Sequence, residues 1–258
     1  MNSKLKQKMQ RGEKTFGMHV SIGDICVGKV VGGLGYDFIF LDMEHTCLSY
    51  EQLQNQMNTI QAKGTDVLVR VPEHDLPAMK KIMEMGPDGV ILPMVHSYEE
   101  CRELIRCTLY PPYGNRGFGP LNAVDFGAKD ALEYARHNHE EMVRIVMIEH
   151  KDFIDDLERI MTIPFIDGFL FGASDLSGSI NELGDVFGEH TTELIRRAIR
   201  VLHNKKRYVG ISTGSTDPKV LRYWSDLGMD MLSAGQDYGF ILEKARQQLE
   251  TLRHLPRA

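Results

Sequence analysis

The stretch Phe38-Ile39-Phe40-Leu41-Asp42-Met43-Glu44-His45 decides the fold, because an unbroken apolar run ends in acidic residues and a histidine. Short apolar runs of this kind are typical of strands that are buried on both faces, as in a parallel sheet. Similar runs occur along the whole chain: FGMHV from Phe16, VLVRV from Val67, GVILPMV from Gly89, VRIVMIE from Val143, IDGFLFG from Ile166, YVGIS from Tyr208 and DMLSAG from Asp230.

Segments with helical spacing alternate with these strands. Ser97 and Asp217 stand where N-caps are expected. Strands alternating with helices over 258 residues predict an α/β fold, a (β/α)₈ TIM barrel that forms one domain over residues 1–258. The amphipathic faces that predict the helices are Leu53/Met57/Ile60, Cys101/Leu104/Ile105/Thr108, Leu194/Ala198/Ile199/Leu202 and Ile241/Leu242/Ala245/Leu249.

A doubly wound open sheet is the main alternative architecture. That fold usually carries a phosphate-binding G-x-G-x-x-G after its first strand. The nearest stretch, Gly32-Gly33-Leu34-Gly35, has a different spacing and precedes a strand, which favours the barrel. One segment, about 111–130, interrupts the alternation with PPYGNRGFGPLNAVDFGAKD. An ordered loop of this length is usually functional, although a surface excursion is the alternative.

Composition excludes several classes of protein. Hydrophobic residues make up 42 % and charged residues 26 % of the chain, as in ordinary globular proteins. The net charge of −6 argues against non-specific nucleic-acid binding. No apolar run approaches the roughly 20 residues of a membrane span, and the N-terminus lacks the apolar core of a secretory signal. Four scattered cysteines without a C-x-x-C pair indicate reduced thiols, so we expect a cytoplasmic protein.

Candidate catalytic residues follow the predicted strands at their carboxyl ends, where barrels place their active sites. Glu149 and Asp175 end neighbouring strands, and paired carboxylates with open positions suit Mg²⁺ or Mn²⁺. A surface acid and a helix cap are the alternatives for these two residues. His45 is the natural general base, because its ordinary pKa lies near neutrality. Arg70 would stabilise an oxyanion, unless it forms a structural salt bridge.

The turn that follows the sixth predicted strand is a further candidate binding site. The turn Gly172-Ala173-Ser174 leaves backbone N–H groups exposed, and these could hold a substrate carboxylate. A short polar turn without function is the alternative. Glu73, His74 and His150 lie further along their loops, and we assign them no role.

Taken in order, LDMEH, VRVPE, GVILPMV, YPPYGNRG, IEH and GASDLSGS resemble the serial motifs of the HpcH/HpaI aldolase family. The resemblance implies a class II aldolase, similar to 4-hydroxy-2-oxoheptanedioate and 2-dehydro-3-deoxyglucarate aldolases. Such an enzyme reversibly cleaves 4-hydroxy-2-oxo acids to pyruvate and an aldehyde through a metal-stabilised pyruvate enolate. The resemblance also implies Mg²⁺, Mn²⁺ or Co²⁺ as the cofactor, and a homohexamer built as a trimer of dimers.

The family's catalytic roles fall on matching residues of this chain. The resemblance implies that Glu149 and Asp175 are the metal ligands and that His45 is the catalytic base. Arg70 matches the arginine beside the pyruvate oxygen, and Asp42 matches an acid near the water shell of the metal.

The remaining matches concern substrate binding and support of the base. The backbone amides of Ser174 and Asp175 match the site of the pyruvate carboxylate, with Gly172 opening the turn. Glu84 stands where relatives often have an aspartate that supports the base, and its side chain is longer by one methylene. Ser212 replaces an apolar residue that is common in relatives near the pyruvate methyl group.

Two other departures from the family concern the rest of the pocket. Met147 stands where many relatives have Gln, which removes an amide close to the metal. The loop from Gly117 to Ala128 contains no Lys or Arg and one acid, Asp125. The resemblance implies that this loop reaches toward the site of a neighbouring subunit, where relatives can carry basic residues that face an acidic aldehyde. This loop predicts a preference for neutral over acidic aldehydes.

Two other functions stay open. A lyase of the citrate-lyase or malyl-CoA type would use the same barrel, and it should show basic residues around the mouth of its pocket. A barrel that has lost catalysis could serve as a binding module, since fold does not fix function. The presence of His45, Arg70, Glu149 and Asp175 argues against the binding module.

Overall fold

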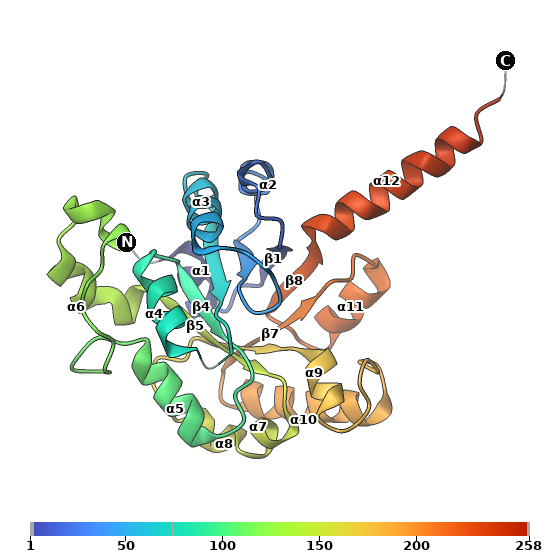
Figure 1. Cartoon of the computed structure of the whole chain (residues 1–258). Coiled ribbons are helices and arrows are strands. Elements are labelled where there is room, and N and C mark those ends of the chain that lie inside the picture. The colour runs from blue at the N-terminus through green and yellow to red at the C-terminus, as the bar shows by residue number, and fades with distance from the viewer. Residues whose placement is uncertain (1–2, 74, 257–258) are drawn as a thin grey trace.

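The computed structural model describes residues 3–73 and 75–256. Its strands form a closed, entirely parallel barrel in which each strand pairs with its neighbours in chain order (Figure 1). This confirms the predicted (β/α)₈ architecture. The strands are β1 (Thr15–Val20), β2 (Phe38–Asp42), β3 (Asp66–Arg70), β4 (Gly89–Leu92), β5 (Val143–Ile148), β6 (Gly168–Phe171), β7 (Tyr208–Thr213) and β8 (Met231–Gln236).

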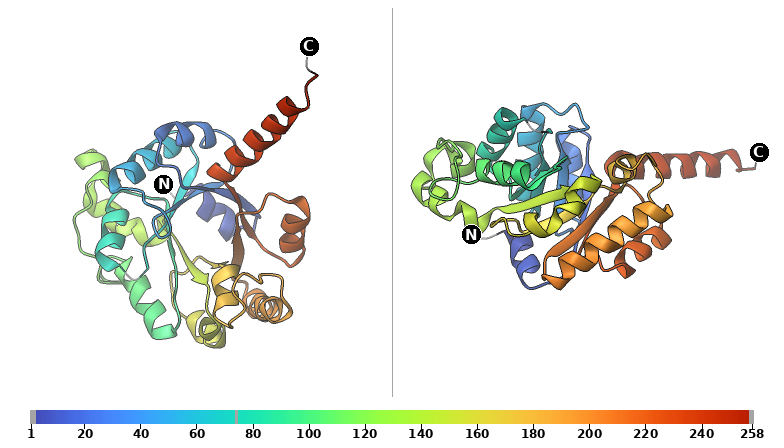
Figure 2. Two further views of the ribbon diagram at one scale, coloured as in Figure 1. Left: turned by 45° about the vertical axis from the view of Figure 1, so that its right-hand side comes forward. Right: turned by 90° about the horizontal axis from the view of Figure 1, so that it is seen from below.

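Helices surround the barrel, as the two further views in Figure 2 show. Ser97 and Asp217 are N-caps as predicted, since their side chains accept bonds from the amides of Glu100 and Lys219. The helices are α1 (Lys4–Gln10), α2 (Ile25–Val31), α3 (Tyr50–Gln61), α4 (Leu76–Glu84), α5 (Tyr98–Cys107), η1 (a 3₁₀ helix, Asn122–Gly127), α6 (Ala131–Glu141), α7 (Lys151–Asp155), α8 (Leu157–Ile160), α9 (Ala173–Gly178), α10 (Glu189–Asn204), α11 (Pro218–Asp226) and α12 (Asp237–Arg253).

The chain has two apolar cores. The larger core lies between the outer face of the sheet and the helices. The smaller one fills the barrel interior, where Phe40, Leu68 and Ile145 meet Leu5 and Met9 of α1. Helix α1 therefore closes the amino end of the barrel and leaves the carboxyl end as its mouth.

The strand register stacks the interior side chains in layers of four, contributed by alternate strands, as in other (β/α)₈ barrels. His19 is paired with Phe40 on β2, and Phe40 is paired with Leu68 on β3. Because the strands of the barrel are staggered, the interior side chain of β3 at the height of His19 is Arg70, two residues beyond Leu68. The same stagger places Met147 of β5 and Ser212 of β7 at this height. These four side chains form the uppermost layer, at the mouth of the barrel.

Helix α12 departs from the regular barrel. It projects away from the other elements (Figure 1), and Asp237 at its start is its buried residue. The predicted apolar face, which includes Ile241, Leu242 and Leu249, is exposed. No helix in the described part of the chain is long and apolar enough to cross a membrane.

Candidate active site

Arg70 and Asp42 form a buried ion pair at the mouth of the barrel. They end neighbouring strands in direct register, so their side chains meet. The Nε and Nη2 atoms of Arg70 donate to the two carboxylate oxygens of Asp42 at 2.9 and 2.7 Å. Burial alone would raise the pKa of Asp42, but the bonds from Arg70 outweigh that effect and lower this pKa. The salt bridge that was the alternative role of Arg70 is therefore present, and it fixes the guanidinium in one orientation.

Glu44 and His45 follow Asp42 on the loop after β2. The Nη1 atom of Arg70 lies 3.0 Å from the carboxylate of Glu44. The side chain of His45 is 62 % exposed, and its Nε2 lies 3.6 Å from the same carboxylate. Burial raises the pKa of Glu44 even though Arg70 pulls it down. His45 is thus accessible to a substrate and lies beside an acidic side chain.

Glu149 enters the mouth from the end of β5. One of its carboxylate oxygens accepts a bond from the amide of Met94 at 2.8 Å. Burial raises the pKa of Glu149 to about 7, and the negative charges of Glu44 and Asp175 add to the increase. A nearby positive charge would favour the ionised form of such a buried carboxylate and lower its pKa.

Gly172 and the first turn of α9 lie beside Glu149. A Cβ atom on Gly172 would come within 2.4 Å of a Glu149 carboxylate oxygen, so this position requires glycine. Helix α9 begins directly after Gly172 and has no side-chain cap. Its first amides, including those of Ser174 and Asp175, therefore have no acceptor within the helix. Binding of a substrate carboxylate by these amides stays a prediction.

Glu149 and Asp175 fit the chemistry of a hard divalent cation. Both offer carboxylate oxygens, which Mg²⁺ and Mn²⁺ prefer. Four acids at the mouth, Asp42, Glu44, Glu149 and Asp175, influence one another or share the single guanidinium of Arg70. Among the described residues, no group of three or more His, Cys, Asp or Glu is arranged to hold a metal ion. The predicted pair would thus bind the cation together with oxygen atoms of substrate or water.

Ser212 lies on the opposite side of the mouth and contacts a histidine that sequence reasoning did not single out. Its Oγ is 2.8 Å from Nε2 of His19 on β1. His19 is buried, and desolvation lowers its pKa to about 4, so its ring is neutral. Met147, in the same layer, lies 3.9 Å from the Nη1 atom of Arg70.

Glu84 is not near His45 of its own chain. It ends α4, which runs back toward the amino end of the barrel, and there it forms an ion pair of 3.0 Å with Arg116. The expected support of the base by Glu84 is therefore not present within one chain. The direction of α4 carries Glu84 to the amino end of the barrel.

The loop 111–130 also packs at the amino end. Asn122 of η1 donates to the backbone carbonyl of Met85 at 2.7 Å, and Ala123 lies against Gly86. The resemblance assigns this loop to the site of a neighbouring subunit, and its packing at the amino end of its own chain leaves that assignment a prediction. Only a second copy of the chain could present the loop to this mouth.

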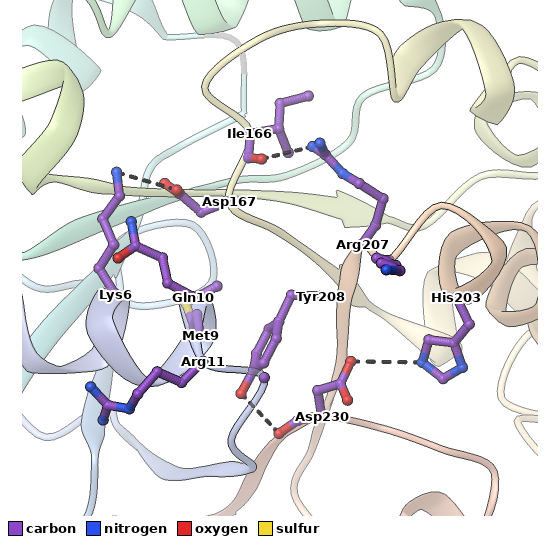
Figure 3. Close-up of a pocket in the computed structure, with 12 residues that line it drawn as sticks. Lys6, Met9, Gln10, Arg11, Ile166, Asp167, His203, Arg207, Tyr208 and Asp230 are labelled. Carbon is purple, nitrogen blue, oxygen red and sulfur yellow. Dashed lines mark hydrogen bonds and ion pairs between the residues drawn. The ribbon is translucent and has the colours of Figure 1, made fainter.

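A pocket of about 540 Å³ lies at the amino end, far from these residues. Figure 3 shows Lys6 pointing toward Asp167, Arg207 toward the carbonyl of Ile166, and His203 toward Asp230. Lys6 lies 3.2 Å from Asp167, and Nη2 of Arg207 donates to the carbonyl of Ile166 at 2.7 Å. These groups hold the barrel bottom together, so we place the candidate active site at the mouth. His74 lies outside the described residues.

The structure adds two residues, Glu44 and His19, to those that the sequence predicts for this site. Glu44 and His19 contact the predicted residues directly. Glu44 had a signal, since it stands between Asp42 and His45. The signal for His19 was weaker: it is the polar residue near the end of the apolar run FGMHV.

Comparisons with known proteins find similar sequences and a similar fold. The family model described as HpcH/HpaI aldolase/citrate lyase matches residues 16–242. A hydroxypyruvate/pyruvate aldolase of Roseovarius nubinhibens is 28 % identical over 95 % of this chain and 94 % of its own. A 2-keto-3-deoxy-L-rhamnonate aldolase of Escherichia coli is 25 % identical over 84 % of this chain and 81 % of its own. The crystal structure of an HpcH/HpaI aldolase/citrate lyase family protein from Burkholderia cenocepacia superimposes with a TM-score of 0.91, at 26 % identity over 98 % of this chain and 100 % of that one.

Proposed function

This chain belongs to the HpcH/HpaI aldolase/citrate lyase family of carbon–carbon lyases, and on that premise we propose that it is a class II pyruvate aldolase. The reaction is the reversible cleavage of a 4-hydroxy-2-oxo acid to pyruvate and an aldehyde. The proposed cofactor is a divalent cation, Mg²⁺, Mn²⁺ or Co²⁺, held by Glu149 and Asp175. The proposed location is the cytoplasm, in keeping with four unpaired cysteines.

One observation carries the proposal: the mouth of the barrel holds more negative charge than its own residues neutralise. Asp42 uses both oxygens on Arg70, and Glu44 shares the same guanidinium. Glu149 is left with a backbone amide and a raised pKa. Buried acids of this kind are usually paired or coordinate a metal. A bound divalent cation would supply Lewis-acid polarisation of the 2-oxo group.

The residues of the chain account for the remaining chemistry. The first amides of α9 bind the substrate carboxylate, and Arg70, held rigid by Asp42, stabilises negative charge on the 2-oxo oxygen. His45 removes a proton from the carbon next to the carbonyl, directly or through a water molecule. Glu44, 3.6 Å from Nε2, stabilises the protonated ring. In the cleavage direction His45, directly or through a water molecule, takes the proton of the 4-hydroxyl group as the bond between the third and fourth carbons breaks and the aldehyde leaves, and it then gives that proton to the third carbon of the enolate.

Exchange of pyruvate methyl protons with deuterated water tests this function directly, because it needs no aldehyde. We expect exchange that depends on added Mg²⁺, Mn²⁺ or Co²⁺ and stops with a chelator. Exchange that persists in full with the chelator would contradict the metal-dependent mechanism. A lyase of the citrate-lyase or malyl-CoA type would instead exchange the methyl protons of an acyl-CoA thioester and leave pyruvate unchanged, and a binding module would exchange neither.

We also propose that the enzyme is a homo-oligomer, with the trimer of dimers that the family resemblance implies. Helix α12 supports this proposal. Its exposed face carries Ile241, Leu242, Leu249 and Leu252, and an isolated helix of this length is marginal in water. An apolar pocket of about 510 Å³ between α2 and the start of α12 is lined by Met18, Val27, Val30, Val31, Leu34 and Tyr36, among others. A second copy of the chain that exchanges α12 would cover both surfaces.

Light scattering of the eluting protein tests the assembly. We expect the wild type to elute as an oligomer and the double variant Leu249→Asp/Leu252→Asp to elute as a smaller species. Gln247→Ala, on the opposite side of the helix, is the matched control and should leave the mass unchanged. A monomeric wild type would overturn the proposal. Assembly would also bring Glu84 and the loop 111–130 of one copy within reach of another copy.

A further inference from the structure

The pocket at the amino end of the barrel lies where two strongly basic segments of the chain meet. Residues 4–14 and 196–207 contain 11 of the 30 Lys and Arg residues and one of the 36 acids, although the whole chain has a net charge of −6. Both segments line the pocket of about 540 Å³. Figure 3 shows Lys6 and Arg11 of the first segment on one side and Arg207 of the second on the other.

The two acids that line this pocket already have partners. Asp167 lies 3.2 Å from Nζ of Lys6. One carboxylate oxygen of Asp230 accepts a bond from the amide of Val209 at 3.1 Å and lies 3.7 Å from Nε2 of His203. These contacts account for both negative charges of the lining, so the charge that is left over is positive.

Arg207 and Lys206 supply that positive charge. The guanidinium of Arg207 is half-buried, and its Nη2 donates to the carbonyl of Ile166 at 2.7 Å. Burial lowers the pKa of Arg207. Neither side chain forms an ion pair with an acid within residues 3–73 and 75–256. A guanidinium with one carbonyl partner keeps further N–H donors for an anion, in the planar arrangement that suits a phosphate or carboxylate group.

The backbone of Lys206 adopts a conformation that favours glycine. Its φ is +53°, and it follows Lys205, the C-cap of α10. The amides of Lys206 and Arg207 donate to the carbonyls of His203 and Leu202, at 2.9 Å each, which ends the helix in a Schellman motif. Glycine is the usual residue at this position, because a side chain adds strain there. Helix termination therefore does not require lysine at 206, whereas a ligand in the pocket would use its charge.

We propose that this pocket is a binding site for an organic phosphate, with the phosphate group on Arg207 and Lys206. A phosphate monoester carries close to two negative charges at neutral pH, which match the two cations that lack an acidic partner. The volume is that of a small-molecule site and exceeds what a free phosphate ion fills. Met9 and Ile166 offer apolar surface to the organic part of the ligand. The site lies at the end of the barrel opposite the mouth, so the inference does not depend on the proposed aldolase activity.

Titration calorimetry and thermal unfolding test the site with AMP, glucose 6-phosphate and inorganic phosphate. The chelator EDTA and a constant ionic strength exclude binding through a divalent cation and general screening. We expect AMP or glucose 6-phosphate to bind with a Kd below about 1 mM and to raise Tm, because a ligand held between α1 and α10 stabilises the folded chain. Which of the two binds more tightly distinguishes a nucleotide site from a sugar-phosphate site. Inorganic phosphate that binds as tightly as both, or no binding of either, would overturn the proposal.

Lys206→Gly separates a ligand site from a structural role. We expect it to weaken binding of the organic phosphate by about tenfold, the scale of one charge-assisted hydrogen bond, without lowering the Tm of the unliganded protein. Lys205→Ala is the matched control: it removes the same charge from the neighbouring position, which does not line the pocket, and should leave Kd unchanged. Unchanged binding in Lys206→Gly, or an equal loss in Lys205→Ala, would overturn the proposal. Arg207→Gln should also weaken binding, and if that variant fails to fold, the two lysine variants decide.

Discussion

Both ends of the barrel bury charged side chains, but only one end satisfies them with its own residues. At the amino end Lys6 bonds to the carbonyl of Met142 at 2.8 Å and to Asp167, and Arg144 bonds to Thr108 and to several backbone carbonyls. At the mouth Arg70 serves two acids, while Glu149 has a single backbone amide and a pKa raised to about 7.

The difference separates charges that stabilise the fold from charges that have too few partners within the chain and would gain from a bound ligand. A buried ion with a complete set of partners contributes to structure, and removing one partner is costly. A group of acids with too few partners destabilises the folded chain, and a bound cation would offset that cost. Substitutions at the two ends should therefore act on different quantities, stability at the amino end and catalysis at the mouth.

The largest effect is expected at the cation ligands. Glu149→Gln and Asp175→Asn should each lower kcat/KM by about 10³–10⁴-fold, because several kcal/mol of Lewis-acid stabilisation are lost. Glu149→Gln should not lower stability, since it removes a buried charge that the folded chain disfavours. Aldol cleavage and thermal unfolding measure the two quantities. Asp167→Asn at the amino end is the matched control, expected to lower stability and to keep kcat. Full activity of Glu149→Gln would remove the metal assignment.

His45→Ala should slow exchange of pyruvate methyl protons by roughly 10²–10⁴-fold, the usual contribution of a positioned general base. Pyruvate should still bind, because the amides of α9 and the cation ligands remain. Isotope exchange and a dissociation constant for pyruvate give the two measurements. Unchanged exchange in this variant would assign the base to another residue.

Glu84→Ala tests a residue that resemblance gives to the mouth and the structure places at the amino end. The Arg116 side chain is completely buried, so loss of its partner should cost about 3–5 kcal/mol of stability. Denaturant unfolding measures this cost. If Glu84 also supports His45 of another copy, deuterium exchange will slow in the folded variant as well. Full exchange in a destabilised variant would leave Glu84 a structural role alone.

The loop 117–128 predicts the charge of the aldehyde. Phe118, Leu121 and Phe126 are exposed in the single chain, and Lys129 beyond the loop pairs with Asp125. A pocket lined by these residues would desolvate a carboxylate without pairing it, so we expect neutral aldehydes to have about tenfold higher kcat/KM than acidic ones of equal length. A clear preference for the acidic aldehyde would show that this loop does not determine the charge of the pocket.

The smallest effect concerns stability against pH. His19 takes a proton at about pH 4 in the folded chain against 6.5 ordinarily, so its contribution is complete above 6.5 and is lost as pH falls toward 4. Asp88 at the amino end has the opposite sign: burial raises its pKa from 3.8 to about 6, so stability falls as pH rises through that window. Unfolding at several pH values should show a shallower acid loss in His19→Phe, by at most about 3 kcal/mol, and a steeper one in Asp88→Asn. Parallel curves for both variants would contradict these assignments.

The sequence by itself determined the barrel and most of its mouth. Strand ends are marked locally, because an apolar run and its first polar residues are adjacent in the chain. In a parallel barrel all carboxyl ends meet at one face. Asp42, Arg70, Glu149 and the turn at Gly172 could therefore be brought together without coordinates.

Only the tertiary structure decided which residues pair. The orientation of α4 sends Glu84 to the amino end, the stagger of the sheet brings His19 to Ser212, and the exposed face of α12 faces away from its own barrel. None of these is visible in local patterns, because a periodic apolar face shows that a helix must be covered and not by what. Pairing depends on register and helix direction, which are properties of the closed sheet and not of any one segment.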